Sequence, residues 1–148
     1  MVTASDTISI KVIFYESVFK PMSFKANDST FETEVLGSSV PVLVHFWAPW
    51  CGVCRLVEPL LLSLQEEWLS NLRLVDVNAD ENFKLVNQYR LKTLPTLLVF
   101  QHGRLCHRID GINSREELKA SLSSFMQSFS HNLAALEPAI QIQPFTEV

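Results

Sequence analysis

The stretch HFWAPWCGVC, from His45 to Cys54, contains two cysteines two residues apart at the end of an apolar run. Residues 41–47 (PVLVHFW) are nearly all apolar, which is typical of a short strand buried on both faces of a sheet. From Cys51 to about residue 69 the apolar residues recur at helical spacing, and Pro59 should kink this helix because proline lacks a backbone donor. The apolar residues of this helix are Leu56, Leu60, Leu61, Leu64 and Trp68. We therefore expect the cysteine pair at the junction of a buried strand and a helix.

The rest of the chain alternates between strand and helix patterns. A capping box, Ser29-x-x-Glu32, predicts a short helix that ends near Gly37. The later pattern predicts a strand at 72–78, a short helix at 81–90, strands at 96–100 and 105–109 joined through His102-Gly103, and a last helix from the capping box Ser114-x-x-Glu117 to about Phe129. Strand–helix–strand units imply parallel pairing, and a close hairpin implies antiparallel pairing. The sequence therefore predicts an α/β fold with a mixed central β-sheet flanked by helices on both faces.

Length and composition fit one domain with surplus residues at both ends. The chain has 148 residues, of which 47% are hydrophobic and 19% charged, so it can bury a sizeable core. We expect the domain at residues 22–129, a dispensable N-terminal extension at 1–21 and a loosely ordered C-terminal tail at 130–148. Residues 1–21 have no basic start and no clear cleavage site, so we expect neither a signal peptide nor a transit peptide.

Charge and cysteine count argue against several classes of protein. The net charge is −4 and no basic block stands out, which argues against nucleic acid as a partner. No apolar run reaches the roughly 18 residues that span a bilayer, so we expect no membrane association. Three cysteines do not make a disulfide scaffold, and their odd number favours a reducing compartment. We expect a bacterial cytoplasm or, as the second choice, an organelle such as a plastid.

The CxxC pair has three chemical interpretations. A structural zinc site needs four ligands, and Cys106 and the histidines show no finger-like spacing. A purely structural disulfide would close too short a loop to add much stability. The third interpretation is redox chemistry, which is what a CxxC between a buried strand and a helix in a βαβ pattern favours.

The helix N-terminus favours a thiolate at Cys51 because unpaired backbone N–H groups and the helix dipole both attract negative charge. Half-ionising a free thiol at neutral pH needs about 2 kcal/mol, and the dipole supplies about 0.3–1 kcal/mol of it. Hydrogen bonds from Cys54 or from backbone amides must supply the rest. We expect Cys51 to be the exposed nucleophile and Cys54 the more buried resolving thiol.

Two segments, VHFWAPWCGVCRLVEPLL (residues 44–61) and LPTLLVFQHGRL (residues 94–105), together with Gly111 resemble the thioredoxin family. The resemblance covers about residues 23–129, and its motifs are specific in order and spacing. It implies a thioredoxin-like fold and a protein-disulfide reductase, in which Cys51 attacks a target disulfide and Cys54 resolves the mixed disulfide. It also implies a monomer without bound cofactor or metal, with disulfide-containing proteins as targets and a disulfide reductase as electron donor.

The same resemblance implies a substrate-facing surface. Its residues are Trp50, Gly52, Val53, Leu94, Pro95 and Gly111. Pro95 matches the family's cis-proline, which lies beside the dithiol and would leave backbone groups of Leu94 open to a substrate strand.

The chain departs from the family's pattern around the cysteines. Val53 replaces a proline, which should loosen the helix start and make the reduction potential more oxidising. His45 stands where the family has a buried aspartate, and Asp76 stands where that aspartate has its lysine partner. Our hypothesis is that Asp76 orients His45, directly or through water, and that His45 accepts the Cys54 proton. The alternative is that His45 is a core polar residue without this role.

Asp110 and Cys106 leave alternatives open. Asp110, before Gly111, stands where the family often has an apolar residue; it either repels acidic targets and the reductase or is a solvated loop charge. Cys106 lies in a predicted strand, where a buried inert thiol is the default and reversible modification the lesser alternative. For the whole chain, the alternative functions are a redox-inactive peptide-binding module and a more oxidising thiol oxidase or isomerase.

Overall fold

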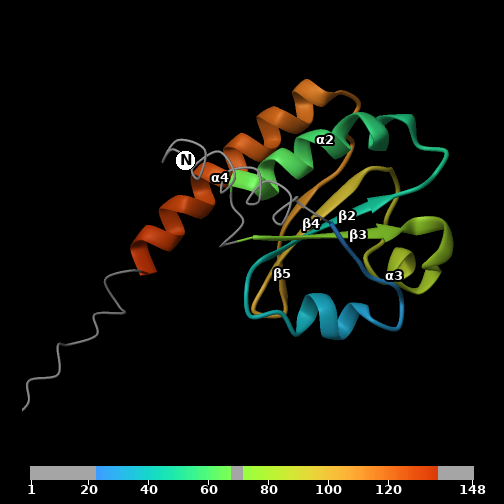
Figure 1. The fold of residues 1–148 in the computed structure, drawn as a ribbon, viewed down its shortest axis with the longest axis horizontal. Helices are drawn as coiled ribbons and strands as arrows, with labels where there is room; N and C mark the ends of the chain where they lie inside the picture. Colours follow the sequence, from blue (N-terminus) through green and yellow to red (C-terminus); the bar gives the residue numbers. More distant parts are fainter. Residues whose placement is uncertain (1–22, 68–71, 137–148) are drawn as a thin grey trace, which may run out of the picture.

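The computed structural model describes residues 23–67 and 72–136, which fold around a mixed five-stranded sheet (Figure 1). Its strands are β1 (Phe24–Lys25), β2 (Val42–Trp47), β3 (Arg73–Asn78), β4 (Thr96–Gln101) and β5 (Arg104–Ile109). In space their order is β1-β3-β2-β4-β5. The pairs β1/β3 and β2/β3 are parallel, whereas β2/β4 and β4/β5 are antiparallel. The predicted α/β class and mixed sheet are confirmed.

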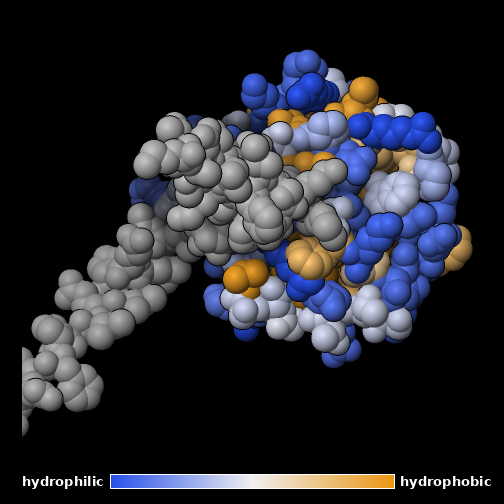
Figure 2. All heavy atoms as spheres, in the orientation of Figure 1, coloured by the Kyte–Doolittle hydropathy of each residue, from blue (hydrophilic) through white to orange (hydrophobic). Residues whose placement is uncertain are grey.

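Helices cover both faces of this sheet (Figure 1). They are η1 (Glu32–Leu36), α2 (Gly52–Glu67), η2 (Ala79–Glu81), α3 (Phe83–Gln88) and α4 (Arg115–Leu136). The helices α2 and α4 contact each other on one face, and η1 and α3 lie on the other. None of the helices within the described ranges combines the length and the apolar character that crossing a membrane requires. In the view of Figure 2 the coloured surface is mainly hydrophilic, with apolar residues in small separate patches.

The side chains of β2 point alternately to the two faces of the sheet. Both faces are buried, as its nearly all-apolar sequence predicted. Val44 and Phe46 belong to the core under η1 and α3, and Leu43 belongs to the core under α2 and α4. Side chains alternate along a strand, so His45 lies on the same face as Leu43, beneath α2. This alternation brings His45 to the side of the sheet from which the cysteine-bearing helix rises.

Helix α2 runs unbroken through Pro59 to Glu67, so the proline does not end it. Its buried residues are Cys54, Val57, Leu61 and Gln65, a spacing that places them on one helical face. Leu56 was among the apolar residues of the predicted pattern, but its side chain is 61% exposed. Trp68, the last of them, lies outside the described residues.

The hairpin turn agrees with the local sequence signals, whereas the start of the first helix does not. His102 and Gly103 both have positive φ (52° and 73°), which is the conformation that two-residue hairpin turns require. The predicted cap at Ser29 is wrong. Instead, Asn27 Oδ1 accepts from the backbone N–H of Ser29 and Thr30, and Asn27 N–H donates to Thr30 Oγ1.

The last helix is longer than predicted. Ser114 Oγ caps it by accepting from Glu117 N–H at 3.1 Å, as expected of a capping box. The Glu117 carboxylate accepts from Asn113 N–H rather than from Ser114. Helix α4 then continues to Leu136, past the predicted end at Phe129. The expected extension at 1–21 and the end of the expected tail lie outside the described residues.

Candidate active site

The two cysteines form a disulfide at the start of α2 (Gly52–Glu67). The backbone N–H of Cys54 donates to Cys51 Sγ at 3.2 Å, so a first-turn amide points at this sulfur as the sequence predicted. The expected exposure of Cys51 is wrong: Cys51 is 5% and Cys54 2% exposed. Trp47, Val53 and Leu94 pack around the pair. Cys51 is nevertheless the less buried of the two.

The CxxC loop between the cysteines is open to solvent on one side. Gly52 is exposed, and no heavy atom lies within 4 Å of the position that a Cβ there would take. Val53 is half-buried and packs against both the cysteine cluster and the core under α2 and α4. Val53, which stands where the family has a proline, therefore contributes its side chain to this packing.

Beneath Cys54 a buried histidine contacts a carboxylate. His45 and Asp76 are direct partners in the register of the parallel strands β2 and β3. His45 Nδ1 lies 3.1 Å from Asp76 Oδ1, and the two side chains are 4% and 13% exposed. In a neutral imidazole, the ring nitrogen that faces a carboxylate at this distance is the donor, which leaves Nε2 as an acceptor. His45 Nε2 is buried and has no hydrogen-bond partner among the described residues.

Both His45 and Cys54 line one hollow of about 370 Å³, which we call the polar hollow. Its other polar lining residues are Ser23, Lys25, Arg55, Glu58 and Asp76. The direct contact between Asp76 and His45 that the sequence hypothesis proposed is present. The hollow gives the unpartnered nitrogen and the sulfur of Cys54 a common polar environment that opens to solvent.

A second hollow, of about 500 Å³, is lined mainly by apolar residues, and we call it the apolar hollow. Trp50, Leu94 and Gly111, three of the predicted substrate-facing residues, line it. Pro95 is buried and follows a cis peptide bond, as predicted. The Trp50 indole is 70% exposed, and its Nε1–H donates to both carboxylate oxygens of Asp80 at 3.0 Å. This contact holds a large apolar ring at the rim of the hollow.

Sequence reasoning missed most residues of the apolar hollow, among them Asp80 and Phe83. Phe83 begins α3 and is 68% exposed, so it is a large apolar side chain facing water. It shares the hollow with Trp50 because η2 and α3 follow β3 while Trp50 follows the neighbouring strand β2. A phenylalanine within the predicted short helix 81–90 was a signal, but only the sheet order shows which hollow it lines.

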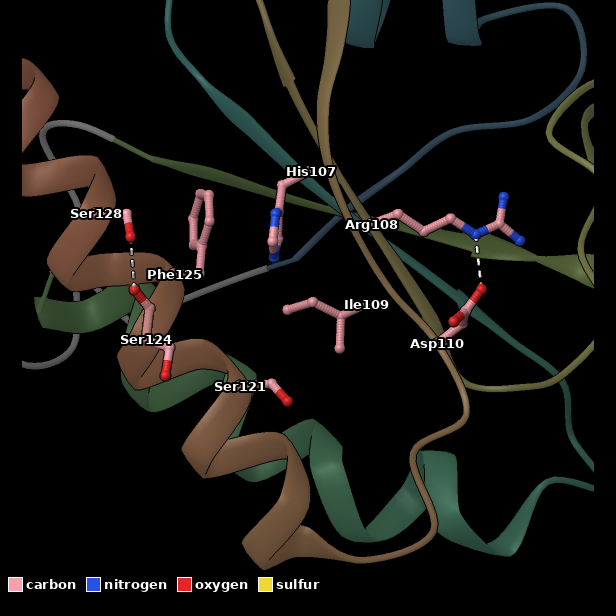
Figure 3. Close-up of a pocket in the computed structure, with 8 residues that line it drawn as sticks. All are labelled: His107, Arg108, Ile109, Asp110, Ser121, Ser124, Phe125 and Ser128. Atoms are coloured by element: carbon pink, nitrogen blue, oxygen red, sulfur yellow. Dashed lines mark hydrogen bonds and ion pairs between the residues drawn. The ribbon is translucent and has the colours of Figure 1, made fainter.

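Strand β5 and the residue after it carry one agreement and one correction. Asp110 is an exposed loop residue, in line with the alternative of a solvated charge, and its Oδ2 accepts from Arg108 Nε at 2.7 Å (Figure 3). Cys106 is exposed rather than buried. The pairing of β4 and β5 shifts register between Val99 and Phe100, which leaves Cys106 without a partner residue. A bulge of this kind redirects a side chain out of the regular alternation.

Within residues 23–67 and 72–136, no three or more His, Cys, Asp or Glu side chains come together as metal ligands. The site is therefore built from a disulfide, a histidine–carboxylate pair and two hollows, one lined mainly by charged and polar residues and the other mainly by apolar residues.

Comparison with known sequences agrees with this geometry. The sequence model of the Thioredoxin family matches residues 22–124. "Thioredoxin 1" of Nostoc sp. is 39% identical over 102 residues, which are 69% of this chain and 95% of that protein. "Thioredoxin" of Acidithiobacillus ferridurans is 44% identical over 98 residues, 66% of this chain and 91% of the relative. "Thioredoxin M-type, chloroplastic" of Chlamydomonas reinhardtii is 38% identical over 100 residues, 68% of this chain and 71% of the relative.

The chain therefore belongs to the thioredoxin family, a family of disulfide oxidoreductases. Its Cys51–Cys54 pair has the position and spacing for dithiol–disulfide exchange.

Proposed function

We propose that Cys51 is the nucleophile and Cys54 the resolving thiol in the reduction of target-protein disulfides. The Cys51 thiolate attacks one target sulfur and displaces the other as a thiolate, which forms a mixed disulfide. Cys54 loses its proton and attacks Cys51 Sγ, which releases the second target thiolate and closes the Cys51–Cys54 disulfide. The target gains two electrons, and a disulfide reductase must return two electrons to this protein.

The observation that carries this assignment is the contact from Cys54 N–H to Cys51 Sγ at the start of α2. A backbone donor and a helix N-terminus stabilise negative charge on Cys51, the charge that the attacking sulfur must carry. Trp50, which lines the apolar hollow, directly precedes Cys51, and Leu94 packs against the cysteine cluster. These two residues support target approach from the apolar hollow to the CxxC pair.

The same proposal gives His45 the Cys54 proton. Asp76 holds the proton on Nδ1, so Nε2 remains a base that is buried and unpartnered among the described residues. Its membership in the polar hollow beside Cys54 supports transfer between the two groups, directly or through a water molecule. Asp76 orients His45 in this scheme and does not itself exchange protons with the sulfur.

The target strand is proposed to occupy the apolar hollow. Trp50, Leu94 and Gly111 line it, and Pro95 follows Leu94 through a cis peptide bond. Apolar area and a fixed indole suit a peptide segment on either side of a target disulfide. Gly52 and Val53 would contact the same segment as it crosses the CxxC loop.

Partners and compartment follow from the family and from the relatives. We propose diverse disulfide-containing proteins as targets and a monomer as the acting form. The relatives include a cyanobacterial and a chloroplastic protein, which supports a bacterial cytoplasm or a plastid as the compartment.

The experiment that tests the function is the reduction of insulin disulfides by the purified chain with dithiothreitol as electron source. We expect catalysis, together with a Cys51/Cys54 reduction potential near or below about −270 mV in glutathione buffers. A potential above about −200 mV would identify an oxidant or isomerase instead. Absence of insulin reduction by a fully reduced, folded protein would favour the redox-inactive binding module.

A further inference from the structure

Arg108, on β5, forms three hydrogen bonds that connect different parts of the fold. Its Nε donates to Asp110 Oδ2 at 2.7 Å, Nη1 donates to the Tyr89 carbonyl at 2.6 Å, and Nη2 donates to the Arg90 carbonyl at 3.1 Å. Figure 3 shows the guanidinium turned toward Asp110 and away from the serines of α4. The sequence analysis assigned no role to Arg108.

The acceptors of Arg108 border the two walls of the apolar hollow. Tyr89 and Arg90 follow α3 and lead into residues 91–94, which form one wall. Asp110 leads into residues 111–113, which form the other. A weaker link runs directly between the walls, because Gly111 N–H donates to Thr93 Oγ1 at 3.3 Å. Arg108 thus connects the starting points of both walls.

The chemistry of these contacts requires arginine. The last carbonyls of a helix have no intrahelical donor, and a guanidinium can donate to several acceptors in one rigid plane. It also neutralises the Asp110 carboxylate beside the hollow. Arg90, whose carbonyl is one acceptor, has a positive φ of 50°, a conformation that costs energy in a non-glycine residue. The hydrogen bond from Arg108 holds the chain where it turns in this way.

We propose that Arg108 is a positioning residue that sets the separation of the two walls of the apolar hollow for an extended segment of a target protein. The proposal rests on the target-binding role given to the hollow above. Arg108 does not touch the cysteines, so its effect is on target binding and not on the exchange of sulfur bonds.

The test compares Arg108→Gln and Arg108→Lys with Arg104→Gln, an exposed arginine on the same strand that does not line the hollow. With insulin as substrate, Arg108→Gln should raise KM about tenfold with kcat unchanged, the effect expected on losing a hydrogen bond to a charged group. Arg108→Lys keeps the positive charge but lacks the planar guanidinium with its several donors. Its insulin KM should therefore lie between those of the original protein and Arg108→Gln. Arg104→Gln should behave as the original protein does.

Three further measurements separate positioning from other causes. Hydroxyethyl disulfide is too small to span the hollow, so its reduction should stay within twofold in every variant. Asp110→Asn leaves both carbonyl contacts of Arg108 in place and should change the insulin KM less than Arg108→Gln does. Backbone amides of residues 91–94 should exchange hydrogen faster in Arg108→Gln.

The proposal is overturned if Arg108→Gln leaves the insulin KM unchanged, or if Asp110→Asn reproduces its full effect, since charge alone would then be responsible. Failure of the proposed function has a different signature. In that case the original protein would not reduce insulin, whatever residue stands at position 108.

Discussion

The two hollows beside the disulfide differ in chemistry although both lie at the same end of the sheet. The polar hollow contains His45, Asp76 and Cys54, with charged side chains at its opening. The apolar hollow contains Trp50, Phe83 and Leu94. The difference teaches that the surroundings of one disulfide can combine a hollow suited to moving a proton with a hollow suited to holding an apolar segment.

Replacing each of the two cysteines should have the largest effect on insulin reduction and should distinguish the roles of the two hollows. Cys51→Ser should lower insulin reduction by at least about a thousandfold because it removes the attacking sulfur. Cys54→Ser should instead accumulate a mixed disulfide with the target, seen by mass spectrometry of the non-reduced protein. Cys106→Ser is the matched control and should keep full activity. Accumulation of a mixed disulfide on Cys54 in the Cys51→Ser protein would reverse the assigned roles.

The next effect concerns the polar hollow. His45→Ala should slow resolution of the mixed disulfide about a hundredfold near pH 7, which is the size of a general-base contribution. The rate should recover at alkaline pH, where Cys54 loses its proton to solvent. His131→Ala, an exposed histidine on α4, is the control. An unchanged pH–rate profile in folded His45→Ala protein would leave His45 as a core polar residue only.

A smaller effect is expected from Asp76. Asp76→Asn keeps the size of the side chain but loses the charge that holds the proton on His45 Nδ1. We expect resolution about tenfold slower near neutral pH, because the other tautomer of His45 becomes accessible. Insulin KM should not change, since Asp76 does not line the apolar hollow. A raised KM with normal resolution would contradict the separation of the two hollows.

The apolar hollow is tested by Phe83→Ser, which should raise the insulin KM about threefold to tenfold through lost apolar contact area. The control is Leu56→Ser, because Leu56 is 61% exposed and does not line the hollow. The resolution rate should be the same in both variants. An equal rise of KM in both would mean that general surface hydrophobicity, and not the hollow, binds the target.

The smallest effect is on the reduction potential. Val53→Pro should lower it by about 30 mV or less, since a proline fixes φ in the first turn of the helix, and 30 mV corresponds to about 1.4 kcal/mol for two electrons. Glutathione equilibration of both proteins measures the shift. A higher potential in the proline variant would mean that the packing of Val53 matters more than the stiffness of the helix start.

Much of the site follows from local sequence. The buried strand before Cys51, the helix after it and the hairpin at His102-Gly103 all depend on spacing within a few residues. The contact between His45 and Asp76 was also predicted, but it came from the family resemblance and not from spacing. The register of β2 against β3, in which these two residues are partners, is the physical reason for the contact.

The errors have a common cause in non-local packing. Cys106 is exposed because a register shift between β4 and β5 interrupts the alternation. Leu56 is exposed because the docked face of α2 is the one that carries Val57 and Leu61. Both outcomes depend on how an element meets its neighbours, which the residues of that element do not specify.

The sequence by itself determined the order of strands and helices, the place of the CxxC at a helix start and the family, because these depend on periodicity and on short motifs. Tertiary structure alone decided that Arg108 donates to the Tyr89 carbonyl and that Phe83 and Trp50 line one hollow. The physical reason is that such contacts join segments far apart in the chain, and their geometry is set by the order and register of the sheet.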